Sequence, residues 1–380
     1  MSEPCCRRSH DVVRGQDRAV LIIGGGPAGL ATALELARLN VAAVVVERSA
    51  YDDRRLGEHL TPAGALQLRA FDRGFQAPAG LHGRSAGVTA YWGSETANHT
   101  DYFLHPGQYG LNLSRPQFDA DLALTGESSG IKILRAASLK RAVRSNAAWQ
   151  VDIDRDGGTD QVTASFVVDA TGRPATFARG QGARIHAHDR QVAVAAFWDG
   201  ADQAGANTRS LVETVENGWW YYARIGATRT MCMFVTDDDL LPRGSARDVR
   251  AWWFDKLSLA VHVSRQVADI APFCEFVTRS ARSQCLDIPF GLDWLAVGDA
   301  AMAFDPLASQ GIVKALDHGR RAAAAISAHL QGDDVSLETY ALRLRHEYAA
   351  FEATRAQYYS LERRWPSSIF WQRRIAVAAP

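Results

Sequence analysis

The chain is poor in lysine and carries no net charge. Among its 380 residues, 42 are basic and 42 are acidic, so the formal net charge is zero. The sequence therefore offers no overall positive field for nucleic acid, and we expect no nucleic-acid partner. Only four of the basic residues are lysines, namely Lys132, Lys140, Lys256 and Lys314. A chemistry that depends on a lysine consequently has very few positions to occupy.

Cysteines and long apolar runs are also scarce. The five cysteines are scattered and odd in number, which excludes a disulfide framework and a C-x-x-C metal site. Reduced thiols of this kind predict a cytoplasmic protein. His186 and His188 form an H-x-H pair without an evident third ligand, so we predict no metal site. No apolar run approaches the roughly 18 residues of a membrane-spanning helix, so we expect no membrane span.

The N-terminal pattern of apolar residues predicts a βαβ unit. Hydrophobic residues make up 47% of the chain and charged residues 22%, as in ordinary globular proteins. Residues 19–23 form an apolar run typical of a buried parallel strand. A glycine-rich turn follows, then a predicted helix from 28 to 40 and a second buried strand over 41–46.

The remainder of the chain predicts a second domain inserted into the first. Two further buried-strand patterns, over 165–169 and 294–297, belong with the N-terminal unit, whereas 81–104 and 186–285 alternate like antiparallel strands. Helices are predicted near 309–330 and over 336–365. We therefore predict an α/β fold with a discontinuous Rossmann-like domain, a second antiparallel-sheet domain and a C-terminal helical segment. Their predicted ranges are 17–80, 106–185 and 286–335 for the first, 81–105 and 186–285 for the second, and 336–380 for the third.

The glycine-rich turn has the spacing of a dinucleotide-binding motif. Gly24, Gly26 and Gly29 supply G-x-G-x-x-G directly after a strand and before a helix. The first glycine permits a tight turn, the second allows a pyrophosphate to approach, and the third lets helix and strand pack closely. Glu47 ends the next predicted strand, where it can accept hydrogen bonds from a ribose hydroxyl. This motif alone leaves NAD and FAD open.

Further motifs favour FAD. The stretch 167–173 (VVDATGR) contains Asp169 and Gly172, and the stretch 294–300 (WLAVGDA) contains Gly298 and Asp299. Together with 113–119 (LSRPQFD) and 57–62 (GEHLTP), they resemble the FAD-dependent monooxygenase superfamily, which includes aromatic hydroxylases and flavin halogenases. The resemblance implies that FAD is the cofactor and that Asp299 binds its ribityl chain. It also implies that Arg115 contacts the flavin and that 57–62 lies beside the isoalloxazine ring.

The segment 305–312 (DPLASQGI) resembles the loop and helix start that face the flavin pyrimidine ring in this superfamily. The dipole at such a helix N-terminus favours the negative charge of reduced flavin. Backbone N–H groups of Ser309, Gln310 and Gly311 can donate there, and we include Gln310 among the predicted catalytic residues. The predicted cofactor-binding residues are Gly24, Gly26, Pro27, Ala28, Gly29, Glu47, Arg48, Arg115, Asp169, Gly172, Gly298, Asp299, Pro306, Ser309, Gly311 and Ile312.

Two residues that the superfamily's halogenases need are missing from their expected places. Halogenases carry a glutamate in the loop before the flavin-facing helix, where this chain has Ala308. They also use a lysine that should fall near residues 75–100, but residues 1–131 contain no lysine. Arginine is no substitute, because its planar guanidinium stays protonated. Oxygen transfer is the simplest remaining chemistry.

A narrower resemblance concerns the substrate. The segments 309–312, 218–222 and 358–371 resemble flavoproteins that modify a tryptophan side chain of a partner protein during tryptophylquinone cofactor biogenesis. This resemblance implies an FAD-dependent monooxygenase that hydroxylates an aromatic ring, an indole above all, of a small molecule or of a tryptophan-containing peptide or protein. Because no second dinucleotide motif is present, the electron donor is expected to be transiently bound NAD(P)H or reduced flavin.

Several assignments stay open at this point. His59 and Asp305 are both candidates for the base that removes the ring proton. Trp220 and Tyr222 are predicted to bind substrate from one face of a strand, with core packing as the alternative. A flavin halogenase, a flavin reductase or dehydrogenase, and a non-redox maturation chaperone that retains FAD are the alternative functions. Incorporation of oxygen-18 separates an oxygenase from a dehydrogenase.

Overall fold

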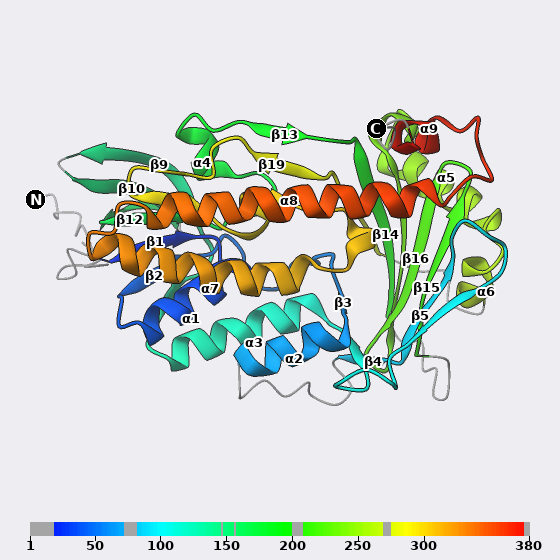
Figure 1. Cartoon of the computed structure of the whole chain (residues 1–380), viewed down its shortest axis with the longest axis horizontal. Coiled ribbons are helices and arrows are strands. Elements are labelled where there is room, and N and C mark those ends of the chain that lie inside the picture. Colours follow the sequence, from blue (N-terminus) through cyan, green and yellow to red (C-terminus); the bar gives the residue numbers. More distant parts are fainter. Residues whose placement is uncertain are drawn as a thin grey trace, which may run out of the picture.

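A buried parallel sheet organises the first domain of the computed structural model, which describes residues 19–71, 82–145, 147–155, 157–199, 208–268 and 275–375. Its strand order is β20-β21-β12-β1-β2-β8, and all neighbours are parallel except β20 and β21. The strands are β20 (Phe290–Gly291), β21 (Trp294–Ala296), β12 (Phe166–Asp169), β1 (Val20–Ile23), β2 (Ala43–Val46) and β8 (Lys132–Leu134). The predicted βαβ unit and the two later buried strands thus lie side by side, although they are far apart in sequence (Figure 1).

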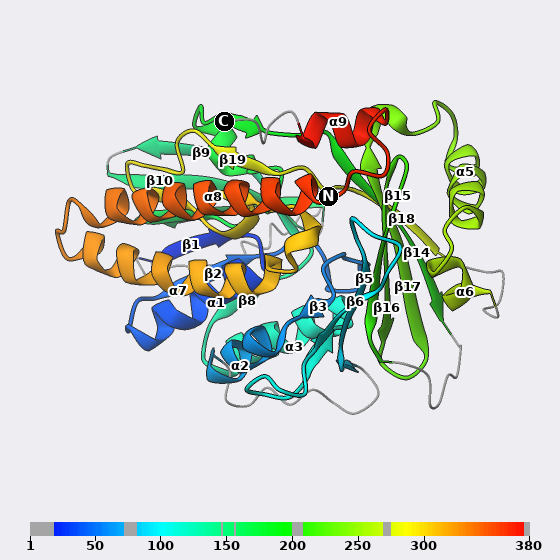
Figure 2. The same ribbon diagram turned by 45° about the vertical axis from the view of Figure 1, so that its right-hand side comes forward.

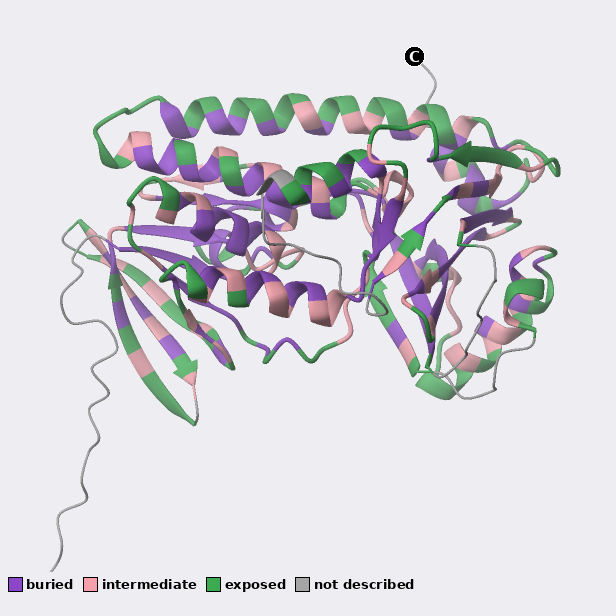
Figure 3. Cartoon of the chain, turned by 90° about the horizontal axis from the view of Figure 1, so that it is seen from below, coloured by how far each residue is buried: buried purple, intermediate pink, exposed green. Residues whose placement is uncertain are grey.

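The helices of this domain pack against the sheet and against one another. They are α1 (Pro27–Arg38), α2 (Pro62–Phe71), α3 (Arg115–Ser128), α4 (Thr176–Gly180) and α7 (Gly311–Leu330). Helices α1 and α7 pack closely, because a Cβ at Gly319 would lie 2.5 Å from the Cβ of Ala31. The strands of the large sheets are mostly buried, while the helices carry exposed outer faces (Figure 3). Within the described ranges, no helix combines the length and the apolar character that crossing a bilayer requires.

The second domain is built on a seven-stranded sheet with the order β18-β14-β17-β16-β15-β5-β6. The strands are β18 (Glu275–Ser280), β14 (Gln191–Asp199), β17 (Arg229–Asp237), β16 (Gly218–Ile225), β15 (Ser210–Val215), β5 (Gly87–Tyr91) and β6 (Asn98–Asp101). The prediction of a purely antiparallel sheet needs one correction, since β5 pairs with β15 in parallel. The parallel pairing joins the two separate chain segments, which no hairpin connects. Helices α5 (Ala246–Ser258) and α6 (Val263–Val267) lie on the outer side of this sheet (Figure 2).

Smaller sheets complete the structure. They comprise β9 (Ala137–Ser145), β10 (Ala148–Arg155) and β11 (Gly158–Ala164), then β13 (Ile185–Ala187), β19 (Gln284–Leu286) and β22 (Met302–Ala303), and finally β3 (His59–Leu60), β7 (Gly110–Asn112) and β4 (Gly83–Ser85). The predicted domain boundary at 80/81 and the last residues of the C-terminal segment, 376–380, lie outside the described residues.

The C-terminal segment bridges the two domains. Helix α8 (Ser336–Ser360) packs against α7 at one end and reaches the seven-stranded sheet at the other (Figures 1 and 2). It ends five residues earlier than predicted, and α9 (Ile369–Ile375) follows. Two arginines anchor α9, since Arg373 and Arg374 both pair with the buried Asp237 of β17. The C-terminal segment is therefore part of both domains rather than an appendage of one.

Candidate flavin site

Three loops at the carboxyl ends of β1, β12 and β21 meet in close contact. Gly24 has φ +112°, and a Cβ there would lie 2.1 Å from the backbone oxygen of Ala170. A Cβ at Gly29 would lie 2.0 Å from the Gly24 oxygen, and one at Gly298 would lie 2.5 Å from the Cβ of Ala28. Such distances exclude any side chain, so these glycines let the loops approach one another. Ligands of open α/β sheets bind at this edge.

The start of α1 fits a pyrophosphate group. Gly26 is the N-cap residue, no side chain caps the helix, and Pro27 follows at the first helical position. A Cβ at Gly26 would meet nothing within 4 Å, so the backbone faces open space there. Gly172, with φ +73°, is equally open in the neighbouring loop. Uncapped N–H groups beside open space are what an anionic phosphate needs at a helix N-terminus.

Glu47 holds the glycine turn from the end of β2. Its buried carboxylate accepts hydrogen bonds from the Gly25 N–H at 2.7 Å, from Ser49, and from Arg55 at 2.9 Å. Burial favours the neutral acid, but the hydrogen bonds of Ser49 and the charge of Arg55 outweigh it and keep the pKa of Glu47 below its usual value. The carboxylate is thus ionised and fixed where the sequence predicts a ribose hydroxyl. Arg48, also predicted to bind the cofactor, is exposed beside it.

Asp169 lies inside its own loop. The buried carboxylate accepts hydrogen bonds from the N–H and hydroxyl of Thr171, at 2.9 and 2.7 Å, and from the Ala178 N–H at 2.7 Å. It thereby fixes the loop that carries Gly172 and the first turn of α4. The Asp169 side chain therefore stabilises the loop, and the backbone of that loop is the part available to a ligand.

Asp299 is paired with a buried lysine. Lys314, with 1% of its side chain exposed, donates to the Asp299 carboxylate at 2.8 Å, and Arg173 lies 3.7 Å away. Desolvation favours the neutral acid, yet the charges of Lys314 and Arg173 hold the pKa of Asp299 below its usual value. An ionised carboxylate with 35% of its side chain exposed can accept hydrogen bonds from ribityl hydroxyls. Sequence reasoning did not identify Lys314 as its partner.

The loop before α7 is held by Asp305. One oxygen of this buried carboxylate accepts the Leu307 N–H at 2.9 Å, and the other accepts Tyr359 Oη at 2.7 Å and Arg355 Nε at 3.1 Å. Asp305 was a candidate base, but these three donors give it a positioning role. Pro306 begins the short 3-10 turn Pro306–Ala308 that follows.

The residues after this turn face outward at the start of α7. Ser309 has φ +49°, and Gln310, the exposed N-cap residue, has no side chain capping the helix. Gly311 opens α7, and a Cβ added there would meet nothing within 4 Å, whereas Ile312 is buried and anchors the first turn. The Ser309 N–H, one of the three predicted donors, is engaged by the Pro306 oxygen at 3.0 Å. The N–H groups of Gln310 and Gly311 lie at the uncapped start of α7, and their contact with the flavin stays a prediction.

His59 lies in a buried hydrogen-bonded network. Its Nδ1 is 2.8 Å from Asn112 Oδ1, and its Nε2 is 3.0 Å from Tyr102 Oη. Burial lowers the pKa of His59, so the neutral ring donates to Asn112 and accepts from Tyr102. Both nitrogens are consequently engaged, and His59 ties β3 and β7 to the segment after β6. This arrangement suits a structural residue better than the predicted base.

The two faces of β16 have different neighbours. Trp220 and Tyr222 belong to a cluster beneath α5 and α6, where the Trp220 ring lies 4.9 Å from the Trp253 ring. Trp219 and Tyr221 point to the opposite face, in a cluster that also touches Leu307 of the flavin-facing loop. The predicted substrate contacts at Trp220 and Tyr222 are therefore corrected to core packing, because α5 and α6 cover that face.

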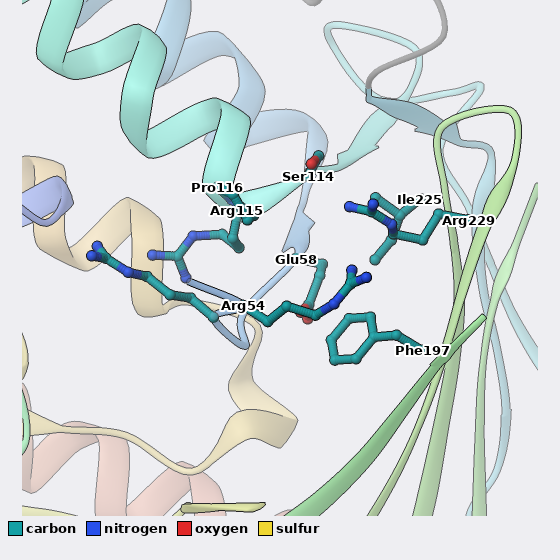
Figure 4. Close-up of a pocket in the computed structure, with 9 residues that line it drawn as sticks. Arg54, Glu58, Ser114, Arg115, Pro116, Phe197, Ile225 and Arg229 are labelled. Atoms are coloured by element: carbon teal, nitrogen blue, oxygen red, sulfur yellow. The ribbon is translucent and has the colours of Figure 1, made fainter. Parts of the chain in front are cut away.

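A pocket lies where the first domain meets the seven-stranded sheet (Figure 4). It has a free volume of about 10 Å³, enough for one water molecule, and is lined by Arg54, Arg55, Glu58, Ser114, Arg115, Pro116, Phe197, Ile225 and Arg229. It adjoins a wider cleft of about 570 Å³, which shares Arg54, Ser114, Pro116, Ile225 and Arg229 with it. Arg115 was predicted to contact the flavin, whereas Glu58 and Phe197 were not assigned a role. The Gly57-Glu58 pair was visible in the sequence, but the burial of its carboxyl was not.

Arg115 connects this pocket to the loops that meet at the sheet edge. Its guanidinium donates to the backbone oxygen of Leu56 at 2.6 Å and pairs with the buried Asp119 at 3.1 Å. Its charge also contributes to holding the pKa of Asp299 low. Arg115 therefore lies near both the predicted ribityl contact and the pocket, and its contact with the flavin stays a prediction.

Comparison with known proteins agrees with this arrangement. The FAD binding domain family matches residues 17–269. LodB of Marinomonas mediterranea, named a putative FAD-dependent oxidoreductase, is 28% identical over 372 residues, covering 94% of this chain and 97% of that protein. The flavin-dependent halogenase CmlS superposes with a TM-score of 0.85 at 24% identity, covering 94% of this chain and 67% of the other.

A further solved structure has the same fold. The peptidyl tryptophan dihydroxylase QhpG, described as essential for tryptophylquinone cofactor biogenesis, superposes with a TM-score of 0.76. The two chains are 24% identical, and the match covers 93% of this chain and 78% of the other. With the family match spanning most of the chain and its glycine loops meeting at one sheet edge, the chain belongs to the FAD-binding domain family and has the fold of flavin-dependent monooxygenases and halogenases.

Proposed function

We propose that this chain is an FAD-dependent monooxygenase that hydroxylates an aromatic ring, an indole of a small molecule or of a tryptophan-containing peptide or protein. The observation that carries the proposal is the composition of the site next to the flavin-facing loop. Ala308 stands in that loop where the resemblance places a halogenase glutamate, and none of the described residues lining the pocket is a lysine. The residues for halogen transfer are thus missing, while those for holding FAD are present.

The walls of the site suit a flat apolar ring. Phe197 and Ile225 line the pocket from the seven-stranded sheet, and Leu56 and Leu307 of the first domain pack against the cluster to which both belong. Aromatic side chains on a rigid sheet can stack on an indole and keep water away from it. The likeness to QhpG, a peptidyl tryptophan dihydroxylase, supports a substrate of this class.

FAD, when bound, supplies the reduced flavin that activates O2, with NAD(P)H or free reduced flavin as electron donor. The chain's own residues bind and orient it. The uncapped N-terminus of α1 would hold the phosphates, and Asp299, fixed by Lys314, would accept hydrogen bonds from the ribityl chain. The open N-terminus of α7 favours negative charge on the ring system.

Labelled oxygen tests the proposal. The FAD-loaded protein, a reductant and a tryptophan-containing peptide are incubated under oxygen-18 gas, with chloride and bromide present or absent, and the peptide is analysed by mass spectrometry. One labelled oxygen atom per indole, independent of halide, is the expected result. Hydroxylated product without label, a halide-dependent product, or a desaturated product would each contradict a monooxygenase.

A further inference from the structure

Glu58 is fixed at the junction of the two domains by its backbone. It follows Gly57 and directly precedes β3, which pairs with β7. The backbone oxygen of Glu58 accepts the Leu113 N–H at 2.7 Å. Only 3% of the residue is exposed. The position of this carboxyl is therefore set by the sheet and does not depend on a flexible surface loop.

The carboxyl has one occupied and one unoccupied oxygen. Glu58 Oε2 accepts a hydrogen bond from the Gly57 N–H at 2.9 Å. Glu58 Oε1 is buried and has no hydrogen-bond partner among the described residues. Leaving a buried acceptor unpaired costs roughly 1–3 kcal/mol, more when the group is charged. The fold thus keeps an unpaired buried oxygen here at a cost in stability. This oxygen belongs to Glu58, which lines the pocket (Figure 4).

The arginines around the pocket are engaged elsewhere. Arg115 pairs with Asp119, Arg55 with Glu47 and Asp119, and Arg54 and Arg229 both pair with Asp199. Phe197 and Ile225 add apolar wall to the same pocket. Glu58 therefore lies in a surrounding that is partly apolar, without an arginine committed to neutralising it.

This surrounding changes the acidity of the carboxyl. Burial raises the pKa of Glu58 to about 7, although the charge of Arg115 opposes the rise. Tyr221 of β16 is close enough that the charge of Glu58 contributes to raising the pKa of its phenol. The charged groups that line the pocket with Glu58 are Arg54 and Arg55 of its own loop, Arg115 of α3 and Arg229 of β17, and Arg115 is the one whose charge lowers the pKa of Glu58. A carboxyl that titrates near neutral pH is suited to general acid–base catalysis.

Resting on the proposed function, we propose that Glu58 is the catalytic base that removes the proton from the ring carbon being hydroxylated. One atom of O2 forms the new C–O bond and the other leaves as water, with two electrons from NAD(P)H or reduced flavin. The ring C–H bond then breaks, its electron pair restores the aromatic system, and the proton forms an O–H bond with Glu58 Oε1. The proton passes to solvent through the adjoining cleft.

Single-turnover kinetics test this role. Reduced, FAD-loaded protein with the peptide is mixed with O2, and the rate of hydroxylated product is measured from pH 5 to 9 for the native protein, E58Q, E58D and the control E127Q. Glu127 pairs with Arg135 near the end of α3, away from the pocket. We expect the native rate to rise through about pH 7. E58Q should be about 100-fold slower and lose this pH dependence. E58D should retain part of both, and E127Q should match the native protein.

Infrared spectroscopy provides a readout that does not depend on turnover. The difference spectrum between pH 5 and pH 9 should contain a carboxylic acid band in the native protein, titrating near pH 7, that E58Q lacks. The native protein could form labelled product while E58Q is equally fast or shows the same carboxylic acid band. Either result would overturn the role of Glu58 and leave the proposed function intact. Native protein that forms no labelled product would overturn the proposed function and this role with it. Flavin content and thermal unfolding of E58Q show whether its loss of rate reflects misfolding, and E58D provides a second variant that keeps a carboxyl.

Discussion

The hydroxyl of Tyr359, near the end of α8, donates a hydrogen bond of 2.7 Å to the carboxylate of Asp305 in the loop before α7. The same hydroxyl accepts hydrogen bonds from Gln191 at 2.7 Å and from Trp219 at 3.1 Å, both on the seven-stranded sheet. One phenol thus joins the C-terminal helix, the flavin-facing loop and the second domain. The geometry of the loop depends on a residue about fifty positions further along the chain.

Replacing Tyr359 by phenylalanine should destabilise the protein and loosen this loop. Losing a hydrogen bond to a buried carboxylate costs about 2 kcal/mol. Y359F should therefore unfold at lower denaturant concentration and release FAD more readily, as measured by equilibrium denaturation and by flavin fluorescence. The neighbouring Y358F is the control, because Tyr358 is 55% exposed. Equal flavin retention in the two variants would argue against a positioning role for Tyr359.

Alanine at Gly24 and at Gly26 should have different consequences. G24A places a Cβ 2.1 Å from a backbone oxygen at φ +112°, so the fold itself should be damaged. G26A meets nothing within 4 Å, so it should fold normally but bind FAD at least tenfold more weakly, since its methyl group occupies the phosphate side of the turn. Circular dichroism and FAD titration distinguish the two. Normal FAD affinity in G26A would contradict the assigned phosphate site.

Lys314 should be needed to keep Asp299 in place. K314M removes the cation from a buried pair and leaves a carboxylate without its closest partner, which costs roughly 2–3 kcal/mol because Asp299 is partly exposed. FAD affinity should fall with stability. K140M is the matched control, since Lys140 is an exposed lysine that also pairs with an aspartate, Asp154. The two variants are compared by urea denaturation and FAD titration, and similar losses in both would contradict the prediction.

Substitutions on the two faces of the seven-stranded sheet should have different effects, one on stability and the other on substrate binding. Trp220 is fully buried beneath α5, so W220L should cost roughly 3 kcal/mol without changing the KM of the folded enzyme. Phe197 lines the pocket, so F197L should raise the KM for an aromatic substrate several-fold with a smaller loss of stability. Steady-state kinetics and thermal unfolding of the pair test this. A raised KM in W220L would instead support the sequence prediction that Trp220 binds substrate.

Glu58 should make stability depend on pH. Its pKa is raised by burial to about 7, so the folded state binds more protons than the unfolded state between its usual pKa and 7. Its contribution is therefore lost as the pH rises from about 4.5 to 7, by up to roughly 3 kcal/mol. E58Q should gain stability relative to the native protein between pH 5 and 8. A stability difference that is constant over this range would show that the carboxyl is not buried in solution.

Short-range patterns in the sequence determined much of the first domain. The strand, the glycines and the helix around residue 26 are neighbours in the chain, so their spacing alone dictates a tight turn with a free helix N-terminus. The motifs at Asp169 and Asp299 could be placed on the same sheet edge, because each follows a buried strand. The FAD-binding assignment and the fold class followed from these local signals, and the structure and the family match agree with them.

The tertiary structure decided which side chains are available. Trp219 and Trp220 are equivalent in the sequence pattern, and tertiary packing makes both of them core. Helices α5 and α6 cover Trp220, whereas Tyr359 of α8 and Trp371 of α9 pack in the same cluster as Trp219. In the sequence, Asp305 and His59 are polar residues with no visible partner. In the structure, distant residues such as Tyr359 form hydrogen bonds with them. The segment 57–62 was placed beside the flavin, but the raised pKa of Glu58 was not predicted, because it depends on desolvation by elements far apart in the chain. Local sequence thus set the cofactor-binding turns, whereas long-range packing set the chemistry of the remaining site.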